Sequence, residues 1–139
     1  MNIYFAASIA GGRKLLPVYG RMVDHLKALG HTVLTEHIVA PDVLEQENHF
    51  TAAQVYRRDV DWLQSCDAVV AEVSNPSLGV GYEICYALDC KKAVLALHQQ
   101  DLFISRMITG NDRPGLRVVA YTAEADWRQQ INRFLARAV

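Results

Sequence analysis

Residues 68–83 read AVVAEVSNPSLGVGYE, and this stretch decides the fold. Residues 68–73 form an apolar run of the length of a buried strand. Residues 74–81 contain two glycines and a proline, which is typical of a loop. A helix is predicted to follow, from about residue 80 to residue 90. A strand, a loop and a helix in this order belong to a βαβ unit, the building block of parallel sheets.

The same alternation continues on both sides of this stretch. Apolar runs predict four further strands, at residues 3–7, 32–35, 93–97 and 117–121. Apolar side chains at helical spacing predict a helix from near Leu15 to Gly30 and another through residues 52–63. They also predict a short helix over 102–108 and a final helix over 127–135. Residues 36–49 are polar and broken by Pro41, so we expect a loop there.

Strands that alternate with helices indicate an α/β protein. Right-handed crossovers leave few ways to connect the strands. We expect a three-layer sandwich with a five-stranded parallel sheet in the flavodoxin/Rossmann-like order 2-1-3-4-5. The length suits one domain, so residues 1–139 are predicted to form a single domain.

The composition narrows the function classes. A formal net charge of −1 argues against a protein that coats a nucleic acid polymer, because such proteins need a basic surface. The three cysteines, Cys66, Cys85 and Cys90, have no zinc-site spacing and fit a reduced, cytoplasmic protein. We expect no export signal and no membrane segment, because no apolar stretch is long enough to span a bilayer.

Two loops are candidates for a ligand site, because ligands of open α/β sheets bind beyond the carboxyl ends of the strands. They are residues 8–13 (SIAGGR) and residues 74–81 (SNPSLGVG), which follow neighbouring central strands of the expected order. Both carry serine and glycine and lead into a helix N-terminus, where backbone N–H groups and the helix dipole favour an anion. Each loop alone fits ordinary turn chemistry, but together they indicate a phosphate site.

Two carboxylates stand beside the expected crevice. Glu83 borders the apolar face of the helix after the second loop. Asp59 has Val55 and Leu63 among its helical neighbours, so it lies on the apolar side of its helix and needs partners there. A structural role stays open for each: Glu83 at a helix N-terminus, and Asp59 paired with an arginine or a backbone amide. Two acids in different environments are also what glycosidic cleavage uses.

Other polar residues give weaker signals. His37 follows the second predicted strand at its carboxyl end, so it is a candidate for lining the site. No histidine pair has metal-ligand spacing, and we predict no metal. The order of cysteine, serine and histidine along the chain supports no nucleophilic triad.

Several segments carry a likeness to a known family. The most specific is PSLGVGYE at residues 76–83, and the others are IYFAASIAGGR at 3–13, LTEH at 34–37, DVDWL at 59–63 and DAVVAEV at 67–73. They resemble the nucleoside 2-deoxyribosyltransferase family, and within it the 2'-deoxynucleoside 5'-monophosphate N-hydrolases. The likeness covers nearly the whole chain. It implies hydrolysis of the N-glycosidic bond to free base and 2-deoxyribose 5-phosphate, without metal or organic cofactor.

The resemblance also implies a role for each matching residue. Glu83 would attack or stabilise the anomeric carbon, Asp59 would position Glu83 and assist proton transfer to the base, and Tyr4 would orient Glu83 beside the sugar. Ser105 would reach across a homodimer interface to the phosphate of the neighbouring site. With the crevice argument, the expected substrate-binding residues are Ser8, Ile9, Gly11, Gly12, Arg13, His37, Ser77, Gly79 and Ser105.

The chain departs from the family pattern at two positions. Ala10 stands where the first loop usually has an arginine, and Arg13 is a candidate to replace that cation. Cys85 stands where a glycine is usual, close behind Glu83.

Four alternatives to the hydrolase remain open. Deoxyribosyl transfer between bases would use the same site with a base in place of water. A ribonucleotide hydrolase, such as one acting on a pyrimidine monophosphate, would differ at the sugar. A nucleotide-binding or sensing module would keep the pocket without the reaction, and a flavin-binding protein would share only the fold.

Overall fold

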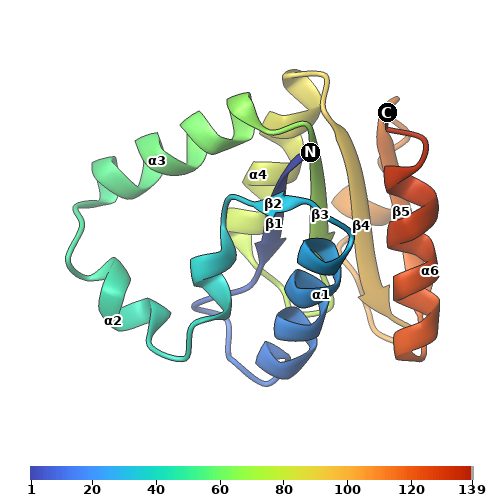
Figure 1. The fold of residues 1–139 in the computed structure, drawn as a ribbon, viewed down its shortest axis with the longest axis horizontal. Coiled ribbons are helices and arrows are strands. Elements are labelled where there is room, and N and C mark those ends of the chain that lie inside the picture. The colour runs from blue at the N-terminus through green and yellow to red at the C-terminus, as the bar shows by residue number, and fades with distance from the viewer. Residues whose placement is uncertain (139) are drawn as a thin grey trace.

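The computed structural model describes residues 1–138 and shows a five-stranded sheet in which every pair of neighbours is parallel. The strands are β1 (Asn2–Ala7), β2 (Thr32–Val33), β3 (Ala68–Glu72), β4 (Ala93–Gln99) and β5 (Leu116–Tyr121). Their order across the sheet is β2-β1-β3-β4-β5, which confirms the predicted order 2-1-3-4-5 (Figure 1).

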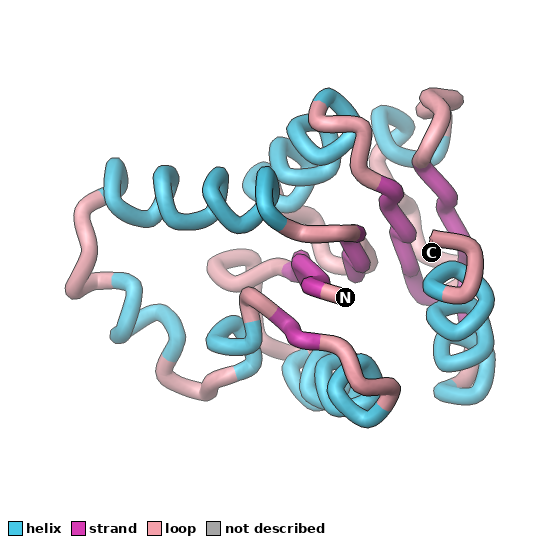
Figure 2. The backbone as a smooth tube through the Cα atoms, turned by 45° about the horizontal axis from the view of Figure 1, so that its top comes forward, coloured by secondary structure: helices cyan, strands magenta, loops and turns pink. Residues whose placement is uncertain are grey.

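Helices cover both faces of the sheet, as the three-layer prediction requires (Figure 2). On one face, α1 (Leu16–Ala28) and α6 (Glu124–Leu135) pack against inward-facing side chains such as Phe5, Val70 and Leu95. On the other face, α3 (Ala52–Ser65) and α4 (Leu78–Asp89) pack against Ala6 and Val69. The central strands are therefore buried on both sides, which explains why their sequences are continuous apolar runs.

The predicted helix boundaries have local causes. Pro17 sits in the first turn of α1, where its missing N–H costs nothing, and Gly30 takes a positive φ of 84° just after the helix end. Thr51 starts α3 with a capping box that it forms with Gln54. Ser77 starts α4 by accepting a hydrogen bond from the Val80 N–H. Because of this cap, α4 begins at Leu78, two residues before the expected start.

The second predicted strand is shorter than expected. β2 ends at Val33, although the apolar run continues to Thr35. The Thr35 hydroxyl accepts a hydrogen bond from the Phe5 N–H (2.9 Å) and donates one to the Phe5 carbonyl (2.7 Å). A side chain thus replaces the next pair of ladder bonds, and the backbone turns away from the sheet.

The segment 36–49 is not the loop that its composition predicted. It contains a 3-10 helix, η1 (Glu36–Val39), and a short α-helix, α2 (Val43–Glu47). Val43, the first residue of α2, is buried, and the Gln46 side chain donates a hydrogen bond to the Asp42 carboxylate one turn earlier. Most residues of α2 are polar, so the sequence shows no apolar periodicity that would predict this helix. In Figure 1, η1, α2 and α3 form an arch beside the sheet.

The short helix predicted over 102–108 is also smaller than expected, since α5 covers only Arg106–Thr109. Within residues 1–138, none of the helices combines the length and the apolar character needed to cross a membrane.

Candidate active site

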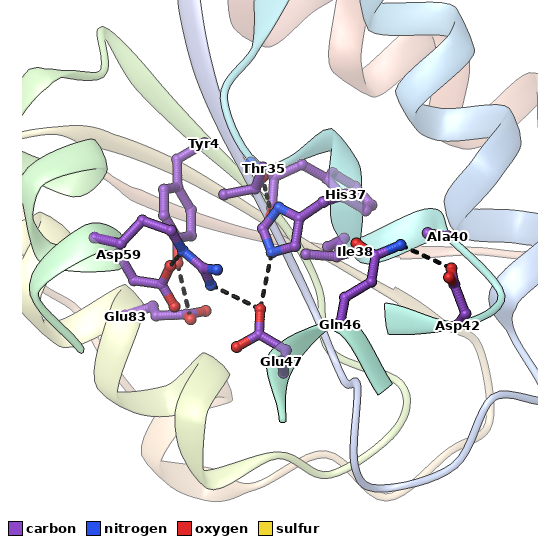
Figure 3. Close-up of polar contacts among 12 residues, drawn as sticks. Tyr4, Thr35, His37, Ile38, Ala40, Asp42, Gln46, Glu47, Asp59 and Glu83 are labelled. Atoms are coloured by element: carbon purple, nitrogen blue, oxygen red, sulfur yellow. Dashed lines mark hydrogen bonds and ion pairs between the residues drawn. The ribbon is translucent and has the colours of Figure 1, made fainter. Parts of the chain in front are cut away.

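The centre of the site joins a strand to a helix. Tyr4 lies in β1 with its side chain on the α3/α4 face of the sheet, where it is buried. Its hydroxyl donates a hydrogen bond of 2.9 Å to Oε1 of Glu83, which α4 carries in its second turn (Figure 3). The strand is fixed by pairing on both sides, so Tyr4 gives the carboxylate a rigid partner.

The surroundings of Glu83 change its acid–base behaviour. Burial raises the pKa of Glu83 to about 7; the hydrogen bond from Tyr4 opposes this rise, and the negative charge of Asp59 adds to it. Burial, together with the charges of Glu83 and Asp59, raises the pKa of Tyr4 far above its ordinary value, so Tyr4 stays a hydrogen-bond donor. Near neutral pH, Glu83 therefore exchanges readily between its charged and neutral forms, which suits a catalytic carboxylate.

Asp59, on α3, has the arginine partner that a structural role would require. Nε of Arg58 donates to Oδ1 of Asp59 over 2.8 Å, and Nη2 of the same guanidinium donates to Oε1 of Glu47 over 2.8 Å. The guanidinium also lies over the Trp62 ring, 5.0 Å from its centre. Arg58 thus links the α3 carboxylate to α2. The pairing does not remove Asp59 from the site, because Asp59 and Glu83 line the same cavity.

That cavity has a volume of about 250 Å³. It brings together five of the residues singled out from the sequence, namely Tyr4, Ile9, His37, Asp59 and Glu83. Its other walls include Leu44, Glu47, Val55 and Arg58. Glu47 and Arg58 were not among the site residues expected from the sequence. The only sequence feature that indicated Arg58 as a site residue was its position directly before Asp59.

His37 lies next to Glu47 in the wall of this cavity. Its Nε2 atom lies 3.3 Å from Oε1 of Glu47 (Figure 3). Its ring centre lies 5.5 Å from that of Trp62. Burial lowers the pKa of His37, and the positive charge of Arg58 lowers it further, although Glu47 opposes both. These effects favour the neutral imidazole, and within residues 1–138 the buried Nε2 atom lies near Glu47 without a hydrogen bond of good geometry.

The two candidate phosphate loops lie against each other, as the strand order predicted. The Asn75 side-chain amide donates to the carbonyls of Gly11 (3.0 Å) and Gly12 (3.2 Å). Ser8, which is buried, accepts a hydrogen bond from the Gly11 N–H (3.2 Å). A Cβ at position 11 would lie 2.5 Å from Oγ of Ser8 and 2.9 Å from the carbonyl oxygen of Pro76. The close approach of the loops therefore requires glycine there.

Arg13 is the last residue of the first loop, but its side chain reaches the η1 segment. Its Nη2 atom donates to the carbonyls of Ile38 (2.7 Å) and Ala40 (3.1 Å), which lie in and just after η1. Among residues 1–138, the buried Nε and Nη1 atoms of Arg13 have no hydrogen-bond partner. In this geometry Arg13 holds the η1 segment, and Ala10 itself is exposed.

Two of the remaining candidates, Ser77 and Ser105, line a second, larger depression. Ser77 and Ser105 face a groove of about 820 Å³ together with apolar side chains of α4 and α5. Three apolar side chains at this groove are unusually exposed for their type: Leu78 (97%) in α4, Met107 (82%) in α5, and Phe103 (79%) in the segment before α5. Gly79 lies exposed in the first turn of α4. Within residues 1–138, no three His, Cys, Asp or Glu side chains are grouped so that they could hold a metal ion.

Glu72 lies on the face of the sheet opposite to Tyr4 and does not line the cavity that contains Glu83 and Asp59. It is fully buried and accepts hydrogen bonds from the backbone and hydroxyl of Ser74 and from the Tyr121 hydroxyl (3.0 Å). Ser74 also accepts a hydrogen bond from the Gln99 N–H, so this network ties the start of the second loop to β4 and β5.

A family model described as nucleoside 2-deoxyribosyltransferase matches residues 3–126, a span that contains every candidate residue and all of the sheet except Asn2. The chain belongs to the nucleoside 2-deoxyribosyltransferase family. The resemblance read from the sequence is thereby confirmed.

Two relatives of this deoxyribosyltransferase-family chain are named 5-hydroxymethyl-dUMP N-hydrolase. The one from Tetraodon nigroviridis is 41% identical over 140 residues, which cover 98% of this chain and 98% of the relative. The one from Homo sapiens is 41% identical over 112 residues, which cover 78% of this chain and 64% of the relative. Among solved structures, the CMP N-glycosidase BcmB of Clostridium botulinum superposes with a TM-score of 0.68 at 19% identity, over 95% of this chain and 99% of that one. That likeness shows a shared fold.

Proposed function

We propose that this protein hydrolyses the N-glycosidic bond of 2'-deoxynucleoside 5'-monophosphates and releases the free base and 2-deoxyribose 5-phosphate. The observation that carries the proposal is the pair Tyr4–Glu83 beside Asp59 in one cavity, with the pKa of Glu83 raised to about 7. The names of the two relatives support the reaction, because 5-hydroxymethyl-dUMP is a nucleotide of this class.

Glu83 acts on the anomeric carbon in this proposal. Cleavage of the bond to the base builds positive charge at that carbon, and the ionised carboxylate stabilises it or forms a bond to it. The hydrogen bond from Tyr4 fixes the direction of the carboxylate. Water then adds to the same carbon and frees Glu83 for the next turnover; its oxygen becomes the hydroxyl of the sugar, and its proton replaces the one that the base takes up.

Asp59 assists the departure of the base. The base leaves with the electron pair of the broken bond, and a proton delivered on the Asp59 side makes it a better leaving group. Arg58 fixes one oxygen of Asp59 and leaves the carboxylate within the cavity. Asp59 therefore positions the reacting groups and handles the proton, while Glu83 faces the sugar.

The two adjacent loops hold the 5'-phosphate in this proposal. Ser8, Ser77 and the backbone N–H groups of Ile9, Gly12 and Gly79 offer hydrogen bonds to an anion next to the N-terminus of α4, while the Gly11 N–H orients the Ser8 hydroxyl. A phosphate fixed there holds the anomeric carbon against Glu83, which lowers the entropic part of the barrier.

A deoxyribosyltransferase is the second candidate, and the description of the matching family model favours it. The difference lies in whether water or a second base takes the sugar. A new nucleotide that forms from one nucleotide and a different free base would identify transfer.

We also propose a homodimer in which the groove between α4 and α5 is covered by a second copy. Leu78, Phe103 and Met107 expose large apolar surfaces there, and Ser105 lies among them. In a dimer, Ser105 would contact the phosphate in the neighbouring site. Sedimentation at micromolar concentration tests this, and a monomeric mass would contradict it. A cytoplasmic location remains a prediction that rests on the three unpaired cysteines.

The test of the reaction is a panel of ribo- and deoxyribonucleoside 5'-monophosphates and the matching nucleosides, with free base followed by chromatography. Base release from deoxy monophosphates, lost in Glu83→Ala, is the expected result. If Glu83→Ala turns over every nucleotide at the native rate, the assigned role of Glu83 is wrong.

A further inference from the structure

Glu47 is a cavity residue to which neither the phosphate loops nor the catalytic pair gives a role. In the proposed binding mode, the phosphate lies at the two loops and the anomeric carbon at Glu83. The base then occupies the remaining part of the cavity, whose walls are His37, Leu44, Glu47, Val55 and Arg58. Glu47 and Arg58 are the charged residues of that wall.

The carboxylate of Glu47 is held in a fixed position. Its Oε1 atom accepts a charge-assisted hydrogen bond of 2.8 Å from Arg58 and lies 3.3 Å from Nε2 of His37 (Figure 3). Arg58 is itself fixed by Asp59 and by the Trp62 ring. The Glu47 side chain is only 17% exposed. Within residues 1–138, these contacts fall on Oε1, so Oε2 remains able to accept a hydrogen bond from a ligand.

An anchored carboxylate of this kind discriminates between bases. It accepts hydrogen bonds and, while ionised, cannot donate them. A base that presents an N–H or O–H group to it gains a charge-assisted bond. A base with a carbonyl oxygen in the same place meets repulsion, and a base with a methyl group leaves the carboxylate unpaired in a desolvated site.

We propose that Glu47 determines base specificity by accepting a hydrogen bond from a donor on the outer edge of the base, an inference that rests on the proposed function. The substituents proposed as that donor are the amino group at C4 of a pyrimidine or C6 of a purine, and the hydroxyl of a 5-hydroxymethyl group. The favoured substrates are therefore deoxynucleoside monophosphates whose base carries one of these groups.

Matched substrate pairs test the inference. dCMP and dUMP differ at C4 by an amino group against a carbonyl, and 5-hydroxymethyl-dUMP and dTMP differ by one hydroxyl. The ratio of kcat/KM within each pair is measured for the native chain, for Glu47→Gln and for Glu45→Gln. Glu45 lies on the same helix but is exposed and outside the cavity, so Glu45→Gln is a control of identical chemistry.

The native chain is expected to favour the donor-bearing member of at least one pair by about ten- to a hundredfold. Glu47→Gln brings that ratio close to one, while Glu45→Gln leaves it unchanged; the pair that responds identifies the donor. Native ratios at or below one for both pairs overturn the inference, as do ratios that Glu47→Gln leaves unaltered. Native ratios at or below one overturn the inference even if Glu47→Gln does not fold.

Failure of the proposed function gives a different result. If the chain releases no base from any of the four nucleotides, the hydrolase assignment fails. The same pairs are then compared by calorimetric binding to the native and Glu47→Gln chains. A binding preference that depends on Glu47 supports base reading without hydrolysis, and equal affinities within both pairs overturn the inference about Glu47.

Discussion

The hydroxyl of Tyr4 donates a hydrogen bond of 2.9 Å to Glu83, so a buried strand residue directs the carboxylate of a helix that lies 79 positions further along the chain. This bond favours the ionised form of Glu83, whereas burial favours the neutral form. The balance between the two leads to testable consequences for activity and for stability.

Replacing Tyr4 by phenylalanine removes the hydrogen bond and keeps the ring. Because the bond lowers the pKa of Glu83, its loss raises that pKa, and the acidic limb of the pH–rate profile moves to higher pH. We expect kcat at pH 7 to fall about tenfold and to recover in part at pH 9. A profile that keeps its midpoint in Tyr4→Phe would show that Tyr4 does not control the ionisation of Glu83.

Glu83 also makes stability depend on pH. Its pKa is about 7 in the folded chain against 4.5 as the ordinary value, so between these values the folded state holds more protons than the unfolded state. The free energy of unfolding contributed by Glu83 therefore falls as pH rises through this window. Glu83→Gln, uncharged throughout, is expected to exceed the native chain in stability by about 1–3 kcal/mol at pH 8, with little difference near pH 5.

Urea unfolding at both pH values measures this gap. Glu45→Gln serves as the control, because Glu45 is exposed. An equal gap at pH 5 and pH 8 would contradict a raised pKa for Glu83.

Gly11→Ala tests the contact between the phosphate loops. The added Cβ would lie 2.5 Å from Oγ of Ser8 and 2.9 Å from the Pro76 carbonyl oxygen, so the loops must separate. We expect KM for a nucleoside monophosphate to rise about tenfold or more, because a small displacement of an anchor is costly. Gly20→Ala is the control, since a Cβ there meets no atom within 4 Å. Equal KM values for the two variants would argue against a phosphate at these loops.

Ala10→Arg tests whether the first loop lacks a useful cation. Position 10 is exposed, and Arg13 is engaged by the carbonyls of Ile38 and Ala40. An arginine at position 10 is expected to lower KM for monophosphates about tenfold through a charge-assisted hydrogen bond. KM for the corresponding nucleosides should not change. A parallel drop for nucleosides would mean that the new side chain contacts the sugar or the base.

Much of the fold could be predicted because the signals are local or obey general rules. Apolar runs such as residues 93–97 are typical of strands buried on both faces, and right-handed crossovers then leave few strand orders, of which the expected one is observed. The conjunction of Tyr4, Asp59 and Glu83 in one cavity agrees with expectations drawn from helical spacing and from the family resemblance.

The missed features depend on contacts that no periodicity encodes. Glu47 meets Arg58 only because α2 turns back toward α3, and α2 itself was hidden in a polar stretch. For Arg13, a candidate cation for the phosphate, the sequence did not indicate the contact with the η1 carbonyls, which the early end of β2 at Thr35 brings within its reach. In both cases, a backbone turn outside the regular sheet decides where a long side chain goes.

The small size of α2 has a consequence for how this protein can change over time. The helix has five residues, and Val43 is its buried one, whereas Tyr4 and Glu83 stand on elements of the core. Substitutions at the exposed positions of α2 are therefore expected to cost little stability, while those around Tyr4 cost much. If Glu47 reads the base as proposed, substitutions in α2 can change the base preference during evolution. Tyr4 and Glu83 can stay unchanged while this happens.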